Sequence, residues 1–565
     1  FNPTWTVTGG TIIGSGTSVQ VNWTTPFTGQ RSISVHIQLN EGQCEQTAQL
    51  LTYDCCTENE INVLNVVNQN LSSTPFSGLG FANPSNSGKQ YVYVNGFFHI
   101  DQDIQFDLIN FKMGPQAKIT IANNVDVTFS NCTIDPGCGY MFDGIYAQNS
   151  TQSIEFFRVG MSSAINGLVS QNGGKLKVSE SDFQSNMLGI QVKNYNPTTT
   201  PTYSSSVSPL EIFGADFYST PFTFPPFSGA PQAIAAIKIE NSGFVAVGKR
   251  NQLPNRFNEQ VFTIHTSMPT AILMLNSGGN IVNNTFYKND VVGSPSQVGA
   301  IVASNSSHPS WLAPLQIGRL WVGGDPADAN HFDMGYQAIR TTNVRSVFII
   351  DNTFKNYGAN ITVVNASNNR VIQGNKINYQ LGSVSVPNRS TTGIVVSSTH
   401  GVPTSGGAVW DNHIEACMQS ILLNTVNTMT VSGNVIRTFT APGASETTIR
   451  AGISATNGWN LIIRQNDLVH NNMPNNSDLT GNNLHGISLN NVVDAFVWDN
   501  SAWRYGSGIY AANDNRVSQF RCNFLVSSVW GFNFKNVYID QQGNPGDPTD
   551  NQWVGNRRAI RTNGT

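Results

Sequence analysis

The sequence has few charged residues and no long apolar runs, and each lack excludes a class of protein. Lys, Arg, Asp and Glu make up 11% of its 565 residues, and the formal net charge is −4. Such a chain offers no basic surface for nucleic acid and no polybasic segment for a membrane. No apolar run approaches the roughly 20 residues of a membrane-spanning helix. We therefore expect no nucleic-acid partner and no membrane span in this chain. It begins at Phe1 without Met or a signal peptide, which suggests a processed chain or a piece of a larger one.

The seven cysteines lack the spacing of a metal site. No CxxC pair occurs, and no Cys and His residues stand at zinc-binding intervals. In an oxidising compartment, Cys132 and Cys138 in CTIDPGC could close a short disulfide loop, and Cys44 could pair with Cys55 or Cys56. Reduced, buried thiols are the alternative.

A phrase with Asn between apolar residues recurs along the chain. It reads FIIDNTF at 348–354 and returns as VIQGNKI, AVWDNHI, TVSGNVI and IIRQNDL. Apolar residues stand three and five positions before the Asn and two after it. The shortest interval between phrases is about 22 residues. The position of the Asn is occupied in turn by Cys132, Val159, Ser181, Ala215, Asn255, Asn284, Asn330, Asn352, Asn375, Asn412, Asn434, Asn466, Asn500 and Asn523.

A period of this length with short alternating strands predicts a solenoid, and a parallel β-helix fits it best. Leucine-rich repeats would need a Leu-rich consensus, and a propeller would need about 40 residues per blade. Equivalent residues of successive coils should lie about 4.8 Å apart. We expect the Asn side chains to form a structural ladder from Asn330 to Asn523, each Asn at a tight corner in the left-handed αL conformation.

The segments GCGYMFDGIYAQNS and KLKVSESDFQSNMLGIQVKN resemble the right-handed parallel β-helix repeats of secreted and surface proteins of Bacteroidetes, many of which leave the cell by type IX secretion. The fourteen repeat positions predict about 14 or more coils. The resemblance implies an all-β, right-handed parallel β-helix and an extracellular or cell-surface location. It leaves activity open, since β-helices serve many functions.

The first residues differ from the repeats. PTWTVTGGTIIGSGTSVQVNW alternates apolar and polar residues around a Gly-Gly turn. It resembles the PKD-like, immunoglobulin-like β-sandwich modules of the same surface proteins. We expect this sandwich at 1–53, a linker or N-terminal cap at 54–92, the β-helix at 93–540, and a C-terminal tail or the start of a further segment at 541–565.

Evidence for an enzyme is thin in the sequence. The Asn-Thr-Asp and Asp-Asp phrases of polygalacturonase-like sites are missing. VWDNHIE places Asp411, His413 and Glu415 at alternate positions, and these are the catalytic candidates, although the repeat alone explains the phrase. HIDQDIQFD places Asp101, Asp103 and Asp107 close together as candidate Ca²⁺ ligands, with solvated edge charges as the alternative. No other cofactor is expected.

A binding surface has more support. The residue two positions before each ladder Asn should face outward, and successive coils carry Trp410, Ser432, Arg464 and Trp498 there. Aromatic faces stack on sugar rings, and Arg464 could lie against Trp498. Trp503 and Tyr505 extend the candidate set, with packing beneath insertion loops as the alternative.

These patterns together favour an extracellular or cell-surface β-helix that acts as a structural, adhesive or glycan-binding element. Its expected partners are extracellular polysaccharides or other cell-surface proteins. A polysaccharide lyase or glycoside hydrolase is the alternative.

Overall fold

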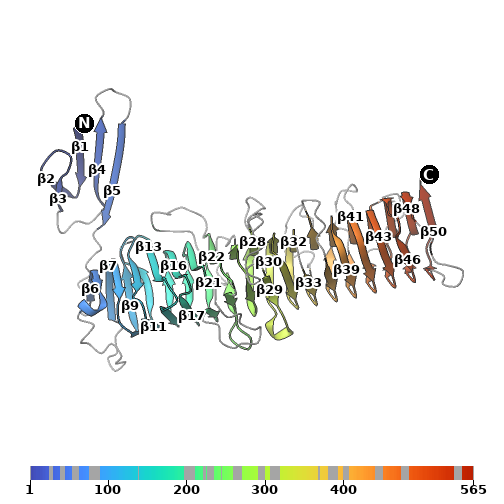
Figure 1. The fold of residues 1–565 in the computed structure, drawn as a ribbon, viewed down its shortest axis with the longest axis horizontal. Coiled ribbons are helices and arrows are strands. Elements are labelled where there is room, and N and C mark those ends of the chain that lie inside the picture. The colour runs from blue at the N-terminus through green and yellow to red at the C-terminus, as the bar shows by residue number, and fades with distance from the viewer. Residues whose placement is uncertain are drawn as a thin grey trace.

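The structure is a computed structural model, and its strands fall into one small antiparallel unit and one long parallel stack (Figure 1). Among the described residues the only helices are the 3₁₀ turns η1 (Leu71–Ser73) and η3 (Pro326–Asp328). No helix in this part of the chain is long and apolar enough to cross a membrane. The structure describes residues 2–23, 30–38, 45–53, 63–74, 90–137, 139–195, 210–219, 224, 234–243, 245–258, 270–289, 299–305, 319–366, 369–378, 392–398, 406–438, 450–471, 483–539, 542 and 550–563.

The N-terminal unit is built from two antiparallel pieces. Strand β4 (Gln30–Gln38) pairs with β1 (Asn2–Thr8) on one side and with β5 (Glu45–Tyr53) on the other. A separate hairpin joins β2 (Gly10–Ile13) to β3 (Gln20–Trp23). The alternation of apolar and polar residues thus produces strands, as expected, and a Gly at the Gly-Gly turn has a positive φ (Gly9, +78°).

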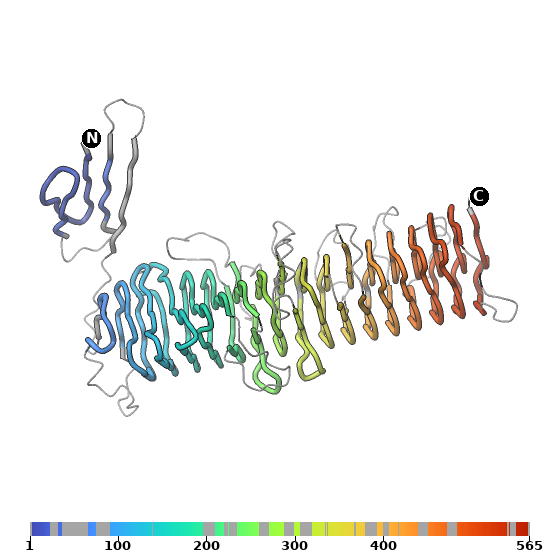
Figure 2. Tube along the Cα trace, viewed as in Figure 1, coloured from blue at the N-terminus to red at the C-terminus, as the bar shows by residue number. Residues whose placement is uncertain are grey.

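The strands from β6 onward form a parallel β-helix, in which each coil contributes one strand to each of three stacks. All pairings in these stacks are parallel, and coils follow one another in chain order along the axis (Figure 2). Parallel strands joined by crossovers take a right-handed sense. Strands β6 (Val63–Asn70) and β7 (Gln90–Ile100) begin the assembly. Pairing also includes β49 and β50 at the other end, so it reaches beyond both predicted boundaries, residues 93 and 540.

Stack A precedes the Asn corner. It contains β8 (Ile104–Asp107), β11 (Asp126–Ser130), β14 (Ser153–Phe157), β17 (Lys175–Ser179), β20 (Leu210–Phe213), β23 (Val245–Val247), β26 (Gly279–Ile281), β29 (Arg319–Gly323), β31 (Ser346–Ile350), β33 (Arg370–Gln373), β36 (Gly407–Trp410), β39 (Asn427–Ser432), the second halves of β41 (Arg450–Arg464) and β43 (Leu484–Trp498), and β46 (Gln519–Arg521).

Stack B follows the Asn corner. It contains β9 (Ile109–Met113), β12 (Thr133–Pro136), β15 (Gly160–Ser162), β18 (Asp182–Gln184), β21 (Asp216–Tyr218), β24 (Asn255–Phe257), β27 (Asn284–Asn289), the first halves of β30 (His331–Thr342) and β32 (Thr353–Val364), β34 (Lys376–Asn378), β37 (His413–Cys417), β40 (Val435–Thr438), β42 (Asp467–His470), β44 (Ser501–Trp503), β47 (Phe524–Val526) and β49 (Gln552–Val554).

Stack C completes each coil. It contains β10 (Lys118–Ile121), β13 (Phe142–Ala147), β16 (Ala164–Gln171), β19 (Leu188–Lys193), β22 (Ala235–Glu240), β25 (Thr270–Leu275), β28 (Gly299–Ser304), the remaining halves of β30, β32, β41 and β43, β35 (Thr392–Ser397), β38 (Gln419–Asn424), β45 (Ser507–Asp514), β48 (Trp530–Tyr538) and β50 (Arg558–Asn563).

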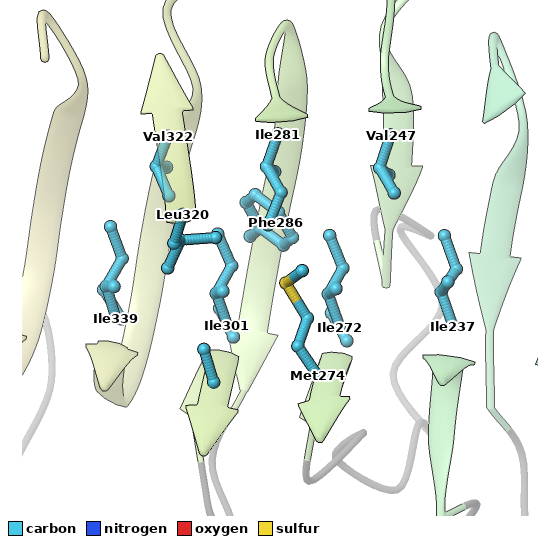
Figure 3. Close-up of a cluster of buried hydrophobic side chains, with 14 of the residues drawn as sticks. Ile237, Val247, Ile272, Met274, Ile281, Phe286, Ile301, Leu320, Val322 and Ile339 are labelled. Atoms are coloured by element: carbon cyan, nitrogen blue, oxygen red, sulfur yellow. The ribbon is translucent and has the colours of Figure 1, made fainter. Parts of the chain in front are cut away.

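Inward side chains of the three stacks meet in one continuous core. Figure 3 shows Ile281 and Val322 from stack A, Phe286 from stack B, and Ile272 and Ile301 from stack C converging on the same interior. The residue two positions after the Asn corner is inward and aromatic over six coils. Ring centroids of neighbouring Phe residues there lie 4.6 to 5.0 Å apart. This phenylalanine stack consists of Phe183, Phe217, Phe257, Phe286, Phe332 and Phe354.

The predicted Asn ladder is confirmed and is longer than predicted. Asn434, for example, donates from Nδ2 to Asn466 Oδ1 at 2.9 Å and to the Val409 carbonyl at 2.9 Å. Its own Oδ1 accepts from the backbone N–H and the Nδ2 of Asn412. The same links join Asn255, Asn284, Asn330, Asn352, Asn375, Asn412, Asn434, Asn466, Asn500, Asn523 and Asn551.

The backbone conformation that we predicted for the ladder Asn is wrong. The αL residue at this corner is the one before the Asn, as at Asp411 (φ +53°) and Gly433 (φ +65°). The ladder Asn must point inward to reach its neighbours, and the sharp turn is made one residue earlier. Asn residues do adopt αL at the corner between stacks C and A, where Asn365 donates to Asn343 at 3.1 Å.

The predicted disulfides cannot be followed in the described part of the chain. Cys44, Cys55, Cys56 and Cys138 lie outside the described residues. Cys132 is buried and its Sγ lies 3.2 Å from the Ser130 carbonyl. The disulfide pairings therefore stay predictions.

Candidate functional site

The residues two positions before the ladder Asn form one column in register on stack A, in which Ser432 is only 8% exposed. Register pairing joins Trp410 to Ser432, Ser432 to Arg464 and Arg464 to Trp498. Trp410 is 39% exposed, so this ring lies open to solvent. The Arg464 guanidinium lies 5.7 Å from the centroid of the Trp498 ring, a cation–π contact worth about 0.5–1 kcal/mol at an exposed site.

A second outward column beside the first was missed in the sequence. Its members from Phe348 onward stand four positions before the ladder Asn, and Trp321, whose coil has extra residues before Asn330, joins it by register and stacks on Phe348 at 4.5 Å. Arg319 lies 5.2 Å from the Trp321 ring and 5.0 Å from the Phe348 ring. Farther along, Ile462 pairs in register with Phe496. The period-2 alternation of strands was the available signal, because residues two apart on one strand share a face.

The two columns form one surface, which we call the aromatic face. It lies on the outside of stack A and runs parallel to the axis. Phe496 contacts Trp498 edge to face at 6.2 Å, which joins the columns. The members of the aromatic face are Trp321, Phe348, Trp410, Ile462, Arg464, Phe496 and Trp498.

Carboxylates border the aromatic face at the Asn corner. Asp411 follows Trp410 directly, and Asp499 follows Trp498; both Asp residues are exposed. The Asp411 side chain lies over Gly433 of the next coil, where an added Cβ would come within 2.4 Å of its Oδ1. Gly433 therefore leaves room for this carboxylate. A carboxylate beside an aromatic ring can accept hydrogen bonds from hydroxyls of a ligand stacked on that ring.

The three catalytic candidates are not brought together. His413 Nε2 lies 2.7 Å from Glu415 Oε1 on the outside of β37, but Asp411 makes no hydrogen bond or ion pair with either of these described residues. Both side chains of the pair are more than 40% exposed, and exposed pairs contribute little to stability.

A surface hollow of about 320 Å³ lies beside this pair on the outside of stack B. Lys355 and Lys376 contribute its cationic groups, and both are exposed. Strand alternation places its polar side chains outward on three successive coils. The hollow is lined by Thr353, Phe354, Lys355, Lys376, Ile377, Asn378, His413 and Glu415.

Trp503 and Tyr505 do not belong to the aromatic face. Trp503 is 36% exposed but lies on stack B, where its Nε1 donates to Ser501 Oγ at 2.7 Å. Tyr505 is fully buried, and its hydroxyl accepts a hydrogen bond from Thr438 at 3.0 Å. Burial raises the pKa of the Tyr505 hydroxyl. The prediction for Tyr505 was wrong because the chain turns back into the core after Trp503, so simple alternation fails there.

The three aspartates suggested for Ca²⁺ each accept a separate hydrogen bond. Asp101 accepts from the Ser72 backbone N–H at 2.9 Å, and Asp103 accepts from the Asp126 N–H at 2.9 Å. Asp107 accepts from an Asn131 side-chain amide at 2.9 Å. No group of three His, Cys, Asp or Glu within the described ranges could hold a metal ion. Ca²⁺ binding remains a prediction without a site here.

Comparison with known proteins does not assign the chain to a family. No family model matches the sequence, and no curated protein matches it. Among solved structures, a double mutant of the periplasmic alginate epimerase AlgG shares 10% identity over 87% of this chain and 83% of its own, with a TM-score of 0.22. The family 28 exopolygalacturonase of Yersinia enterocolitica shares 9% identity over 98% of this chain and 87% of its own, with a TM-score of 0.23. Another AlgG structure has a TM-score of 0.18.

Proposed function

We propose that this protein is an extracellular or cell-surface β-helix that binds an extended polysaccharide along the aromatic face. The observation that supports this most is the register, which lines up Trp410, Arg464 and Trp498 on the outside of stack A. Apolar side chains that form a contiguous exposed patch, rather than single scattered ones, are typical of binding sites.

The spacing of the face suits a chain of sugars. Trp410 and Arg464 lie two coils apart, about 10 Å, and Trp498 lies three coils from Trp410, about 15 Å. One sugar of an extended glycan spans about one coil height. Successive rings of the glycan would stack along the column, while Asp411 and Asp499 accept bonds from sugar hydroxyls. Each contact is weak, and affinity would come from repetition.

The proposal can be tested by affinity electrophoresis through gels that contain neutral polysaccharides. We expect the wild-type protein to be retarded by at least one of them, and Trp498→Ala to lose most of that retardation. Trp459→Ala is the matched control, because Trp459 is 58% exposed at the start of the stack A half of β41, away from the column that holds Trp498. Equal retardation of wild type and Trp498→Ala would reject the aromatic face.

A polysaccharide lyase is the second candidate, and the hollow beside His413 supports it. A lyase needs a base, for which His413 is the candidate, and cations that face an acidic sugar, for which Lys355 and Lys376 are suitable. A glycoside hydrolase fits less well, since Glu415 is the one carboxylate in the lining and that mechanism uses two. Release of unsaturated products, abolished in His413→Ala, would establish the lyase.

We also propose roles for the N-terminal segments and a location for the protein. Residues 1–53 would be a PKD-like, immunoglobulin-like spacer, consistent with the antiparallel pairing of β1, β4 and β5. Residues 54–92 would cap the first coil, since β6 and the start of β7 in this segment pair with the stack. Type IX secretion would place the protein outside the cell. Fractionation of the producing bacterium, with detection by antibody, tests the location.

A further inference from the structure

At other positions along the solenoid, cations on the outside of stack B form ion pairs with carboxylates of the adjacent coil. Lys112 lies 3.9 Å from Asp135, its register partner one coil on. Arg437 lies 2.7 Å from Asp467 of the next coil. Arg256 and Asp216 repeat the arrangement at 3.3 Å and are again register partners. Cross-coil pairing is thus the ordinary way in which this surface neutralises charge.

Lys355 and Lys376 depart from this arrangement. The register neighbours of Lys355 are Asp333 and Asn378, and those of Lys376 are Thr353 and His413. Among the described residues, neither ammonium group has a carboxylate oxygen within 4.0 Å. Two adjacent coils therefore present cations to solvent without the ion pair found at neighbouring positions.

The nearby carboxylates have other contacts, and one of them, Glu415, also lines the hollow. Glu415 is held by His413 at 2.7 Å. The Asp351 side chain lies over Gly374, where an added Cβ would come within 1.9 Å of its Oδ1. Burial and the neighbouring Asp325 raise the pKa of Asp351, while Lys376 lowers it. Asp333 keeps one buried oxygen without a partner. The lysine side chains remain the groups available to a ligand in the hollow.

We propose that this hollow binds the anionic group of an acidic polysaccharide, a carboxylate or a sulfate ester, between Lys355 and Lys376. A volume of about 320 Å³ accommodates such a group with part of its sugar ring. Asn378 can donate to the same anion from its amide. The inference deepens the proposed function, because it rests on glycan binding and specifies the charge of the glycan.

The hollow and the aromatic face meet across the Asn corner. Trp410 belongs to the coil that also carries His413 and Glu415, and Asn412 is the corner residue between them. A polysaccharide that stacks on Trp410 could therefore direct a charged substituent over the corner toward the lysines. Aromatic stacking would be nearly insensitive to salt, whereas the ammonium contacts would weaken as salt screens them.

The test compares polymers that differ only in charge. Polygalacturonate is paired with its methyl ester, and dextran sulfate is paired with dextran. Binding is measured by affinity electrophoresis and by titration at low and high salt. The variant Lys355→Met/Lys376→Met removes both cations and keeps the apolar stems, and Lys118→Met is the control, since Lys118 is exposed on stack C.

We expect the wild-type protein to bind at least one charged polymer about tenfold more tightly than its neutral counterpart at low salt. The double variant should lose this difference and keep its binding to the neutral polymer, and Lys118→Met should keep both. A double variant that still prefers the charged polymer would overturn the inference and leave the aromatic face intact. If Trp498→Ala lost its binding to the neutral polymer but still preferred the charged polymer, the aromatic face and the hollow would not bind the same polysaccharide.

Two further outcomes are decisive. Displacement of the charged polymer by inorganic sulfate, at an ionic strength matched with chloride, would show that the hollow prefers a free anion and would overturn the polysaccharide assignment. Binding to none of the four polymers would overturn this inference, and binding to other neutral polysaccharides would show whether the proposed function survives it.

Discussion

The coils before Asn255 and those after it make the same corner with different residues. The N-terminal coils place Cys132, Val159, Ser181 and Ala215 where the later coils place Asn. The preceding residue is αL in both regions, as at Arg158 (φ +54°) and Asp411 (φ +53°). The turn is therefore set by the αL residue and by strand pairing, and the Asn ladder adds hydrogen bonds to a corner that forms without it.

The outer surfaces of the two regions also differ. In the N-terminal coils, stack A carries the ion pair of Lys177 with Glu155 at 2.6 Å, and its rings Phe157 and Phe213 lie against the cations Arg158 and Lys249. In the ladder region the same surface carries Trp321, Trp410 and Trp498. Since Trp410 is 39% exposed and an exposed ring offers apolar area to a ligand, we expect the proposed binding function in the ladder region.

The core is packed in the same way in both regions, and substitutions in it should cause the largest loss of stability. The phenylalanine stack crosses from Phe183 to Phe354 without a break. Phe217→Ala and Phe332→Ala should each destabilise the protein by about 3–5 kcal/mol, because each leaves a cavity in a close-packed interior. Urea unfolding followed by circular dichroism measures both. A clearly smaller loss for Phe217→Ala would mean that the N-terminal coils are packed less tightly.

The next effect separates the regions. Asn434→Leu removes the bonds to Val409 and Asn466 and leaves buried groups unpaired, at a cost of about 1–3 kcal/mol for each such group. Val159→Leu, at the equivalent corner without a ladder amide, should cost less than about 3 kcal/mol, the upper end expected of overpacking. Comparison of the two unfolding curves checks this. An unchanged midpoint for Asn434→Leu would refute the ladder as a stabilising element.

A smaller effect is expected where a hydroxyl replaces the amide. Ser181 Oγ accepts from the Val159 backbone N–H at 3.1 Å and donates to the Ser179 carbonyl at 2.8 Å. Ser181→Ala should cost about 1 kcal/mol, and Ser181→Asn should restore stability if Asn is the better corner residue. The same unfolding measurement decides. A Ser181→Asn protein less stable than Ser181→Ala would show that the N-terminal coils cannot accommodate a ladder amide.

The sequence could predict what repeats and could not predict what departs from the repeat. The Asn column and the outward position of Trp410 follow from a fixed period. The αL position was misplaced by one residue, although DN and GN in the phrases already set αL-tolerant residues before the Asn. Tyr505 was misassigned because the turn after Trp503 alters the alternation. The hollow could not be predicted from the sequence, because Lys355, Lys376 and His413 come from three coils and share no local motif.

The central claim is that coil spacing sets the spacing of sugar-binding positions, and affinity as a function of glycan length tests it most directly. Oligosaccharides of increasing length, cut from a polymer that the protein binds, are titrated against the wild-type protein and Trp498→Ala. We predict that affinity rises until the oligosaccharide spans Trp410 to Trp498, about 15 Å, and then levels off. Trp498→Ala should reach its plateau at a shorter length. Affinity that is independent of length, or the same length dependence in both proteins, would contradict the account.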